Sequence, residues 1–140
     1  GQTARYSNTF AGNTVGIATA DAVLTILQRD AILASVVSVS QYLGAALASL
    51  AEEVEWIRAI RNAGLFFGIE IGLDGSPAAE RRAMALDVVN AMRENGVLIS
   101  TTGANEDTLK VRPPLVCRNE HADLFLAAFR LALEAAVAPP

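Results

Sequence analysis

Residues 108–116 have the sequence TLKVRPPLV, which predicts a strand that ends at a pair of prolines. Side chains alternate between the two faces of a strand, so Lys110 and Arg112 point to one side and Leu109 and Val111 to the other. The two cations would then lie about 7 Å apart. A proline has no N–H to donate to a neighbouring strand, so we expect the strand to end at Arg112. Two positive charges at a strand end have two interpretations. They could bind an anion, or they could belong to an exposed sheet edge where charge prevents pairing with another chain.

The overall composition is that of a mildly acidic, alanine-rich chain of 140 residues with a net charge of -4. This length suits one ordinary domain, or part of a larger protein, and allows a sizeable core. The charge argues against a nucleic acid as partner. The single cysteine, Cys117, excludes an internal disulfide and favours a reducing compartment, so we expect a cytoplasmic protein. No stretch resembles a signal peptide, and the opening residues GQTAR look like a chain entered in its middle.

Residues 31–51 contain no charged side chain and are long enough to span a bilayer. The stretch nevertheless holds several serines and a glutamine, and its flanks carry acidic residues in place of basic clusters. We therefore expect a buried helix and no membrane. A helix without charge on any side needs cover on several sides, and the rest of the chain is short for that purpose. This points to a missing domain or a partner.

A polar loop with the sequence SNTFAGN, residues 7–13, precedes a helical pattern over residues 14–27. Such a loop can hold a phosphate through hydroxyl, amide and backbone N–H donors, especially beside a helix N-terminus. The simpler interpretation is a turn in which Asn13 caps the helix. The residues of the loop do not decide between the two.

The second half of the chain alternates strand and helix patterns. Residues 54–62 are ambiguous between a helical turn and a short extended segment. The clearer elements are a strand at 64–72, a helix from Pro77 to about Asn95, strands at 97–100 and 108–112, and a final helix from Asn119. They predict an α/β (α+β) fold in which helices cover one side of a small, largely antiparallel sheet.

The outer face of the strand at 64–72 carries Phe66, Gly68 and Glu70. Gly68 leaves a gap there, which either admits a close neighbour or marks a bulge. Glu70 is more simply a solvated or paired residue than a catalytic acid, because no second carboxylate or histidine stands at a useful spacing. Arg58 and Arg61 are most simply surface charges.

Neither a metal site nor a nucleophilic site is expected. His121 is the only histidine, and no cysteine or carboxylate stands near it at metal-ligand spacing. Cys117 has no histidine arranged to activate it, so it is interpreted as a small apolar residue.

Three blocks of sequence, residues 7–13, 60–70 and 109–116, resemble the class III aminotransferases in their order and approximate spacing. These are pyridoxal-phosphate enzymes of fold type I. The resemblance covers nearly the whole chain but only the C-terminal part of such an enzyme. It implies that residues 1–29 are the C-terminal end of the large cofactor-binding domain and that residues 30–140 form the small C-terminal domain.

The resemblance also implies a role for the first block. The family's serine-threonine-phenylalanine motif supplies a threonine that hydrogen-bonds the phosphate of pyridoxal 5'-phosphate in the neighbouring subunit of a homodimer. Thr9 matches that threonine, and Asn8 stands where the family commonly has serine. An amide can still donate to phosphate, so both residues are expected to bind the cofactor.

The third block implies the substrate contacts. Many members bind the substrate carboxylate with an arginine three residues before the first proline, where this chain has Lys110, followed by Arg112 directly before Pro113. The pattern LKVRPPL resembles a subgroup that includes phospho-lyases of amino-alcohol phosphates. Lysine lacks the bidentate fork of arginine, so the pattern leaves open whether the substrate anion is a carboxylate or a phosphate. Lys110 and Arg112 are expected to bind that anion.

The same family needs a lysine that holds the cofactor covalently and an aspartate near its pyridine nitrogen. Both belong upstream of the first block, and Lys110 is the only lysine here. We therefore expect no catalytic residue in these 140 residues and no activity without the upstream large domain. The complete enzyme would transfer an amino group from an amine or amino acid to a keto acid or aldehyde. The alternatives are a phospho-lyase of the same family and a non-catalytic module for small-ligand binding or subunit association.

Overall fold

The structure is a computed structural model that describes residues 8–137. Ser7, the first residue of the polar loop, lies outside this range. The chain divides into two compact units, Gly1–Leu33 and Ala34–Pro140, and each is described by itself.

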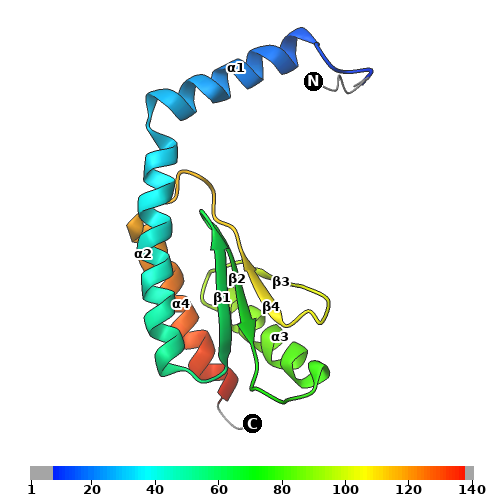
Figure 1. Cartoon of the computed structure of the whole chain (residues 1–140), viewed down its shortest axis with the longest axis vertical. Helices are drawn as coiled ribbons and strands as arrows, with labels where there is room; N and C mark the ends of the chain where they lie inside the picture. Colours follow the sequence, from blue (N-terminus) through cyan, green and yellow to red (C-terminus); the bar gives the residue numbers. More distant parts are fainter. Residues whose placement is uncertain (1–7, 138–140) are drawn as a thin grey trace, which may run out of the picture. The chain divides into compact units, whose positions relative to one another are not determined.

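The first unit contains helix α1, Thr14–Arg29, drawn in blue in Figure 1. Its expected cap is confirmed, because the side-chain oxygen of Asn13 accepts a hydrogen bond of 2.7 Å from the N–H of Gly16. The helix continues two residues beyond the expected end at Leu27. None of its residues is buried.

Helix α2, Ile32–Glu53, contains the uncharged stretch. One stripe of the helix is buried, formed by Val39, Leu43, Leu47 and Leu50. Among the described residues this is also the one helix long and apolar enough to cross a membrane. Leu33 and Val37 are 65% and 56% exposed, so the described chain covers this helix on one side only.

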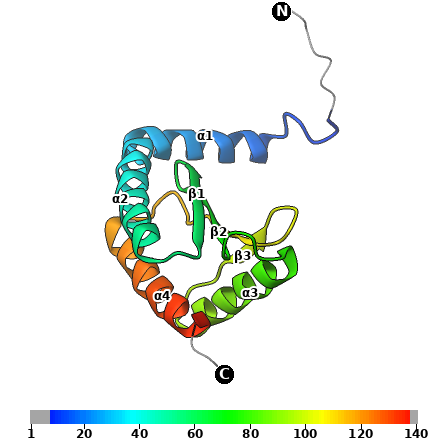
Figure 2. The same ribbon diagram turned by 60° about the horizontal axis from the view of Figure 1, so that its bottom comes forward.

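The second unit is built on a four-stranded antiparallel sheet with the strand order β1-β2-β4-β3. Helix α3, Ala78–Glu94, lies between the second and third strands in the chain, and helix α4, Asn119–Val137, follows the last strand. In Figure 2, α2, α4 and α3 form an arc around one side of the sheet. The strands are β1 Ile57–Ala63, β2 Phe66–Ile71, β3 Ser100–Thr102 and β4 Thr108–Val111.

The core lies between this sheet and the three helices. Alternate residues of the two central strands point into it and are at most 3% exposed, namely Phe67, Ile69, Ile71, Leu109 and Val111. The rings of Phe125 and Phe129 stack there with centroids 5.6 Å apart. The expected α+β architecture, with helices on one side of an antiparallel sheet, is thus the observed one.

Strands β1 and β3 differ most from expectation, and β4 ends at Val111, one residue before the expected Arg112. The ambiguous residues 54–62 contribute strand β1, which pairs with β2 and has an irregular register between Ile57 and Ala59. Strand β3 begins at Ser100, later than the expected residue 97. The N–H of Val97 bonds to the carbonyl of Met92 at 2.9 Å and so closes the C-terminal end of α3 from outside the helix, which keeps this N–H out of the sheet.

Candidate cofactor and substrate site

Two asparagines shape the loop before α1. The side-chain oxygen of Asn8 accepts a hydrogen bond of 2.9 Å from the N–H of Phe10, and its carbonyl accepts one of 3.1 Å from Ala11. From the other end of the loop, the amide of Asn13 donates to the carbonyl of Phe10 at 2.8 Å. The loop is therefore a turn held by its own side chains, with Thr9 exposed within it.

This turn fits one end of pyridoxal phosphate. The hydroxyl of the exposed Thr9 and the side-chain NH2 group of Asn8 are donors that phosphate oxygens accept, and the side-chain oxygen of Asn8 holds the turn. The other end of the cofactor needs a lysine, and the single lysine of the sequence, Lys110, lies on strand β4. The described residues therefore fit a contact to the cofactor phosphate and do not supply partners for the ring.

Lys110 lies on the face of the sheet opposite the core, which we call the open face. Its neighbours across the strands are Gly68 of β2 and Ser100 of β3. The lysine is half-buried, while Leu109 and Val111 on either side of it point into the core. The expected alternation along residues 108–111 is therefore present.

The open face also carries a chain of ion pairs. The carboxylate of Glu70 lies 2.6 Å from the guanidinium of Arg61 and 3.9 Å from that of Arg58. Arg58 in turn bonds to Asp74 at 2.9 Å, and this hydrogen bond raises the pKa of the Arg58 guanidinium. Glu70 is thus a paired strand residue, shared between two arginines.

Arg112 lies beyond the end of the strand, in different surroundings. It is exposed and lines a hollow of about 420 Å³ at the proline pair, and Lys110 does not line this hollow. Most of the lining is apolar, including Leu43, Val97, Leu98, Ile99, Val116 and Phe125. The two cations expected to act together are therefore close in sequence but lie in different local environments.

Cys117 and His121 also line this hollow. Burial raises the pKa of the Cys117 thiol, which keeps it protonated and unreactive at neutral pH. His121 is exposed, and its Nδ1 accepts a hydrogen bond of 3.0 Å from the N–H of Arg118. Among residues 8–137, no three histidine, cysteine or carboxylate side chains are grouped to hold a metal ion.

The structure also draws attention to Arg61, which the sequence presents as an ordinary surface charge. Arg61 lies opposite Gly68, and Gly68 lies opposite Lys110, so the three residues form one row across β1, β2 and β4. In the sequence, the missing side chain at Gly68 indicated that something could lie close to the strand there. The strand register that places Arg61 beside it could not be predicted, because residues 54–62 were ambiguous between a helical turn and an extended segment.

Comparisons with known proteins identify the relatives of this chain. The family model described as aminotransferase class-III matches residues 2–133. An alanine–glyoxylate aminotransferase 2-like protein of Drosophila melanogaster is 36% identical over 93% of this chain and 26% of its own length. An ethanolamine-phosphate phospho-lyase homolog of Caenorhabditis elegans is 32% identical over 83% of this chain and 25% of its own length.

Among solved structures, a phospholyase from Arthrobacter in complex with phosphoethanolamine has a TM-score of 0.84 and 39% identity. The match covers 96% of this chain and 31% of that protein. The chain therefore spans about a quarter to a third of the length of the relatives that it matches. The family resemblance and the expected fold are both confirmed.

Proposed function

Because this chain belongs to the class III aminotransferases, a family that uses pyridoxal 5'-phosphate, we propose that it is the C-terminal part of a larger enzyme of that class. In this proposal residues 1–29 end the large cofactor-binding domain and residues 30–140 form the small domain. The enzyme is a cytoplasmic homodimer that transfers an amino group from an amine or amino acid to a keto acid or aldehyde. The observation that carries the proposal is the family match over nearly the whole chain.

The chain's own residues have two tasks in this enzyme. Thr9, together with the side-chain amide of Asn8, donates hydrogen bonds to the cofactor phosphate from a turn that Asn8 and Asn13 hold in shape. Lys110 binds the anionic group of the substrate, which fixes how its amine is presented, and Arg112 attracts that group from its separate position beyond the strand end. When bound, the cofactor supplies the electron sink that weakens bonds at the amine-bearing carbon. The lysine that moves protons there belongs to the upstream domain, so these 140 residues alone are inactive.

A phospho-lyase of the same family is the second candidate. It is favoured by the 39% identity to the Arthrobacter phospholyase, and by a lysine three residues before the first proline. A lysine ammonium binds phosphate oxygens as a compact point charge, and it lacks the planar fork with which arginine holds a carboxylate. Elimination releases inorganic phosphate from an amino-alcohol phosphate, and transamination releases none.

Product analysis of the complete polypeptide separates these activities. The enzyme is supplied with pyridoxal phosphate and either L-alanine with glyoxylate or phosphoethanolamine, and glycine and inorganic phosphate are measured. Glycine formation supports the aminotransferase, and phosphate release supports the phospho-lyase. If the enzyme converts neither of these two substrates nor any other amine donor, the enzymatic proposal is wrong. The remaining alternative is then a non-catalytic module for ligand binding or subunit association.

The 140-residue chain serves as the control, and we expect it to form neither product. Turnover by this chain would contradict the need for the upstream domain. Turnover that also survives the substitution Lys110→Ala would exclude the only lysine and point to a different mechanism.

A further inference from the structure

The open face of the sheet has a second cation placed to act with Lys110. Arg61 and Lys110 are both in register with Gly68, from opposite sides of strand β2. We propose that Arg61 is a further substrate-binding residue, which joins Lys110 in binding a phosphate monoester above Gly68. This inference rests on the proposed function and adds to it the substrate class and a residue that the sequence pattern did not single out.

The distance between the two cations suits one shared anion. Neighbouring strands lie about 4.8 Å apart, so the Cα atoms of Arg61 and Lys110 are separated by about 10 Å. Both side chains are long and flexible enough to reach the middle of that gap. Gly68 offers no side chain there, which lets a ligand approach the backbone closely.

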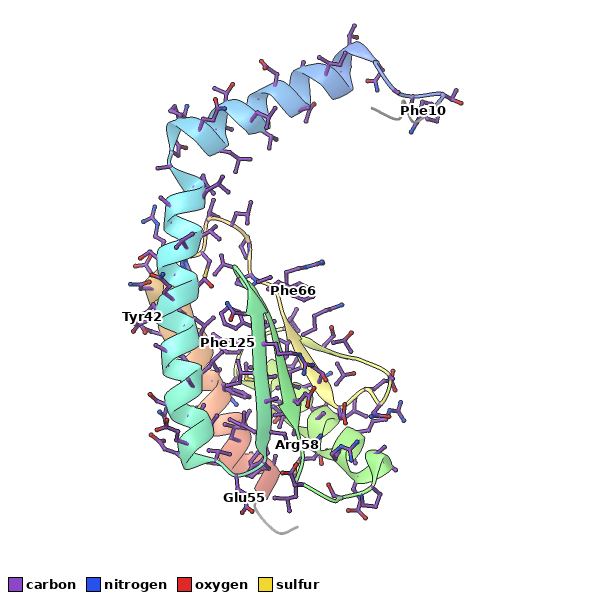
Figure 3. All side chains as sticks on the ribbon, in the orientation of Figure 1. Phe10, Tyr42, Glu55, Arg58, Phe66 and Phe125 are labelled. Carbon is purple, nitrogen blue, oxygen red and sulfur yellow. The ribbon has the colours of Figure 1, made fainter. Side chains whose placement is uncertain are left out.

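The space directly above Gly68 is largely open. A Cβ atom built on Gly68 would meet one heavy atom within 4 Å, the Cγ2 atom of Thr108 at 3.4 Å. Along β2, the half-exposed ring of Phe66 stands on one side of the glycine and the carboxylate of Glu70 on the other. Figure 3 shows Phe66 and Arg58 near opposite ends of this face.

Glu70 holds Arg61 in the ligand-free protein and has a second partner when Arg61 leaves. The side chain of Arg61 is 65% exposed and that of Glu70 is 24% exposed, and their charged groups lie 2.6 Å apart. Water screens the charge on the arginine side of this pair, whereas an arginine and a phosphate form a bidentate, charge-assisted contact. When Arg61 turns toward phosphate, Glu70 keeps the guanidinium of Arg58, which is already 3.9 Å away.

The charge of the ligand follows from these contacts. A phosphate monoester carries nearly two negative charges at neutral pH, and a carboxylate carries one. Lys110 alone can neutralise a carboxylate. The second cation therefore favours a phosphate. The ligand must compete with the Glu70 carboxylate for the guanidinium of Arg61, and a phosphate with nearly two charges competes better than a carboxylate with one.

The test measures binding of phosphoethanolamine to the complete polypeptide loaded with pyridoxal phosphate, by calorimetry. The variant Arg61→Gln should raise the Kd for phosphoethanolamine about tenfold or more, which is the usual effect of losing a charge-assisted hydrogen bond. The Kd for ethanolamine, which has no phosphate, should stay the same. In an active enzyme, KM should rise with the Kd while kcat changes little.

Arg130→Gln is the matched control, because it also removes an arginine from an exposed pair with a glutamate, Glu53, but away from the open face of the sheet. It should leave the Kd for phosphoethanolamine unchanged. A second variant, Gly68→Ala, keeps every charge and should also weaken binding, because its methyl group occupies the space of the anion. Thermal unfolding of each variant shows that it is folded.

The outcomes separate this inference from the proposed function. Equal effects of Arg61→Gln and Arg130→Gln, or an equal loss of ethanolamine binding, would mean a structural role and would overturn the inference. Turnover with no effect of Arg61→Gln would overturn it while the enzyme assignment stands. Binding of phosphoethanolamine that depends on Arg61 in a polypeptide without turnover would support the site and refute the enzyme.

Discussion

Thr9 is the residue through which this chain is proposed to touch the cofactor. Its hydroxyl is exposed in a turn whose shape depends on Asn8 and Asn13, and not on Thr9 itself. In the complete polypeptide we expect Thr9→Ala to weaken pyridoxal phosphate binding by about tenfold, the usual worth of one hydrogen bond to a charged group. The measurement is a titration followed by the absorbance of the bound cofactor.

Thr19→Ala provides the control for that prediction. The hydroxyl of Thr19 donates to the carbonyl of Val15 within α1, so removing it should leave cofactor affinity unchanged. Thr9→Ser keeps the hydroxyl and should restore most of the affinity. If Thr9→Ser is as weak as Thr9→Ala, the hydroxyl is not the contact.

Single residues were predictable where the local sequence alone determines their role. Asn13 before a helical pattern is a good cap, and it caps α1 as expected. Lys110 points to the expected face, because strand alternation fixes it. Arg61 could not be recognised, because its position opposite Gly68 depends on a pairing between two strands.

The ion pair between α3 and the start of β4 should stabilise both elements. The Nε atom of Arg81 lies 2.8 Å from the carboxylate of Asp107, and their side chains are only 15% and 9% exposed. A guanidinium nitrogen of Arg81 also donates to the carbonyl of Ser76. Loss of one partner leaves the other charge poorly solvated, so Asp107→Ala should lower the free energy of unfolding by about 2–4 kcal/mol.

The next pair along the same two segments is a natural control. Arg82 and Glu106 are 54% and 53% exposed, and water screens their interaction. Glu106→Ala should therefore cost less than about 1 kcal/mol in the same urea unfolding experiment. Equal losses for the two variants would mean that burial does not set the strength of these pairs.

At the level of whole helices and strands, the apolar pattern predicted most elements but not their exact ends. Strand β1 was missed because its sequence, IRAIRNA, lacks regular alternation, and the register shift between Ile57 and Ala59 disturbs the period further. It is also an edge strand, where arginine and asparagine are tolerated because one side of the ladder stays open. Its identity as a strand comes from pairing with β2, which no local pattern contains.

Over the whole molecule, burial is distributed unevenly between the two units. Helix α1 has 16 residues and buries none, whereas α4 has a fully buried stripe that includes Phe129 and Ala132. A helix of this length without packing is marginal in water. In the 140-residue chain we expect the amides of α1 to exchange with solvent at nearly the rate of an unfolded segment, and those of α4 to be protected.

Hydrogen exchange followed by mass spectrometry of peptides measures this difference. Peptides from α2 provide an internal reference, because that helix has one buried and one exposed side. Equal protection of α1 and α4 would contradict the prediction. A dilution series then shows whether association of two chains has covered α1.

The strand order β1-β2-β4-β3 has a consequence for how the protein folds. Strands β1 and β2 are consecutive and can pair as a local hairpin, whereas Phe67 pairs with Val111 only after the chain has passed through α3 and β3. Closing that longer loop costs entropy before core contacts form to offset it, so the pairing of β2 with β4 should form late. Lys110 takes part in this pairing. The cation proposed to recognise the substrate is therefore carried by a strand that joins β2 late, together with β3, and newly made chains acquire their binding face only when folding is almost complete.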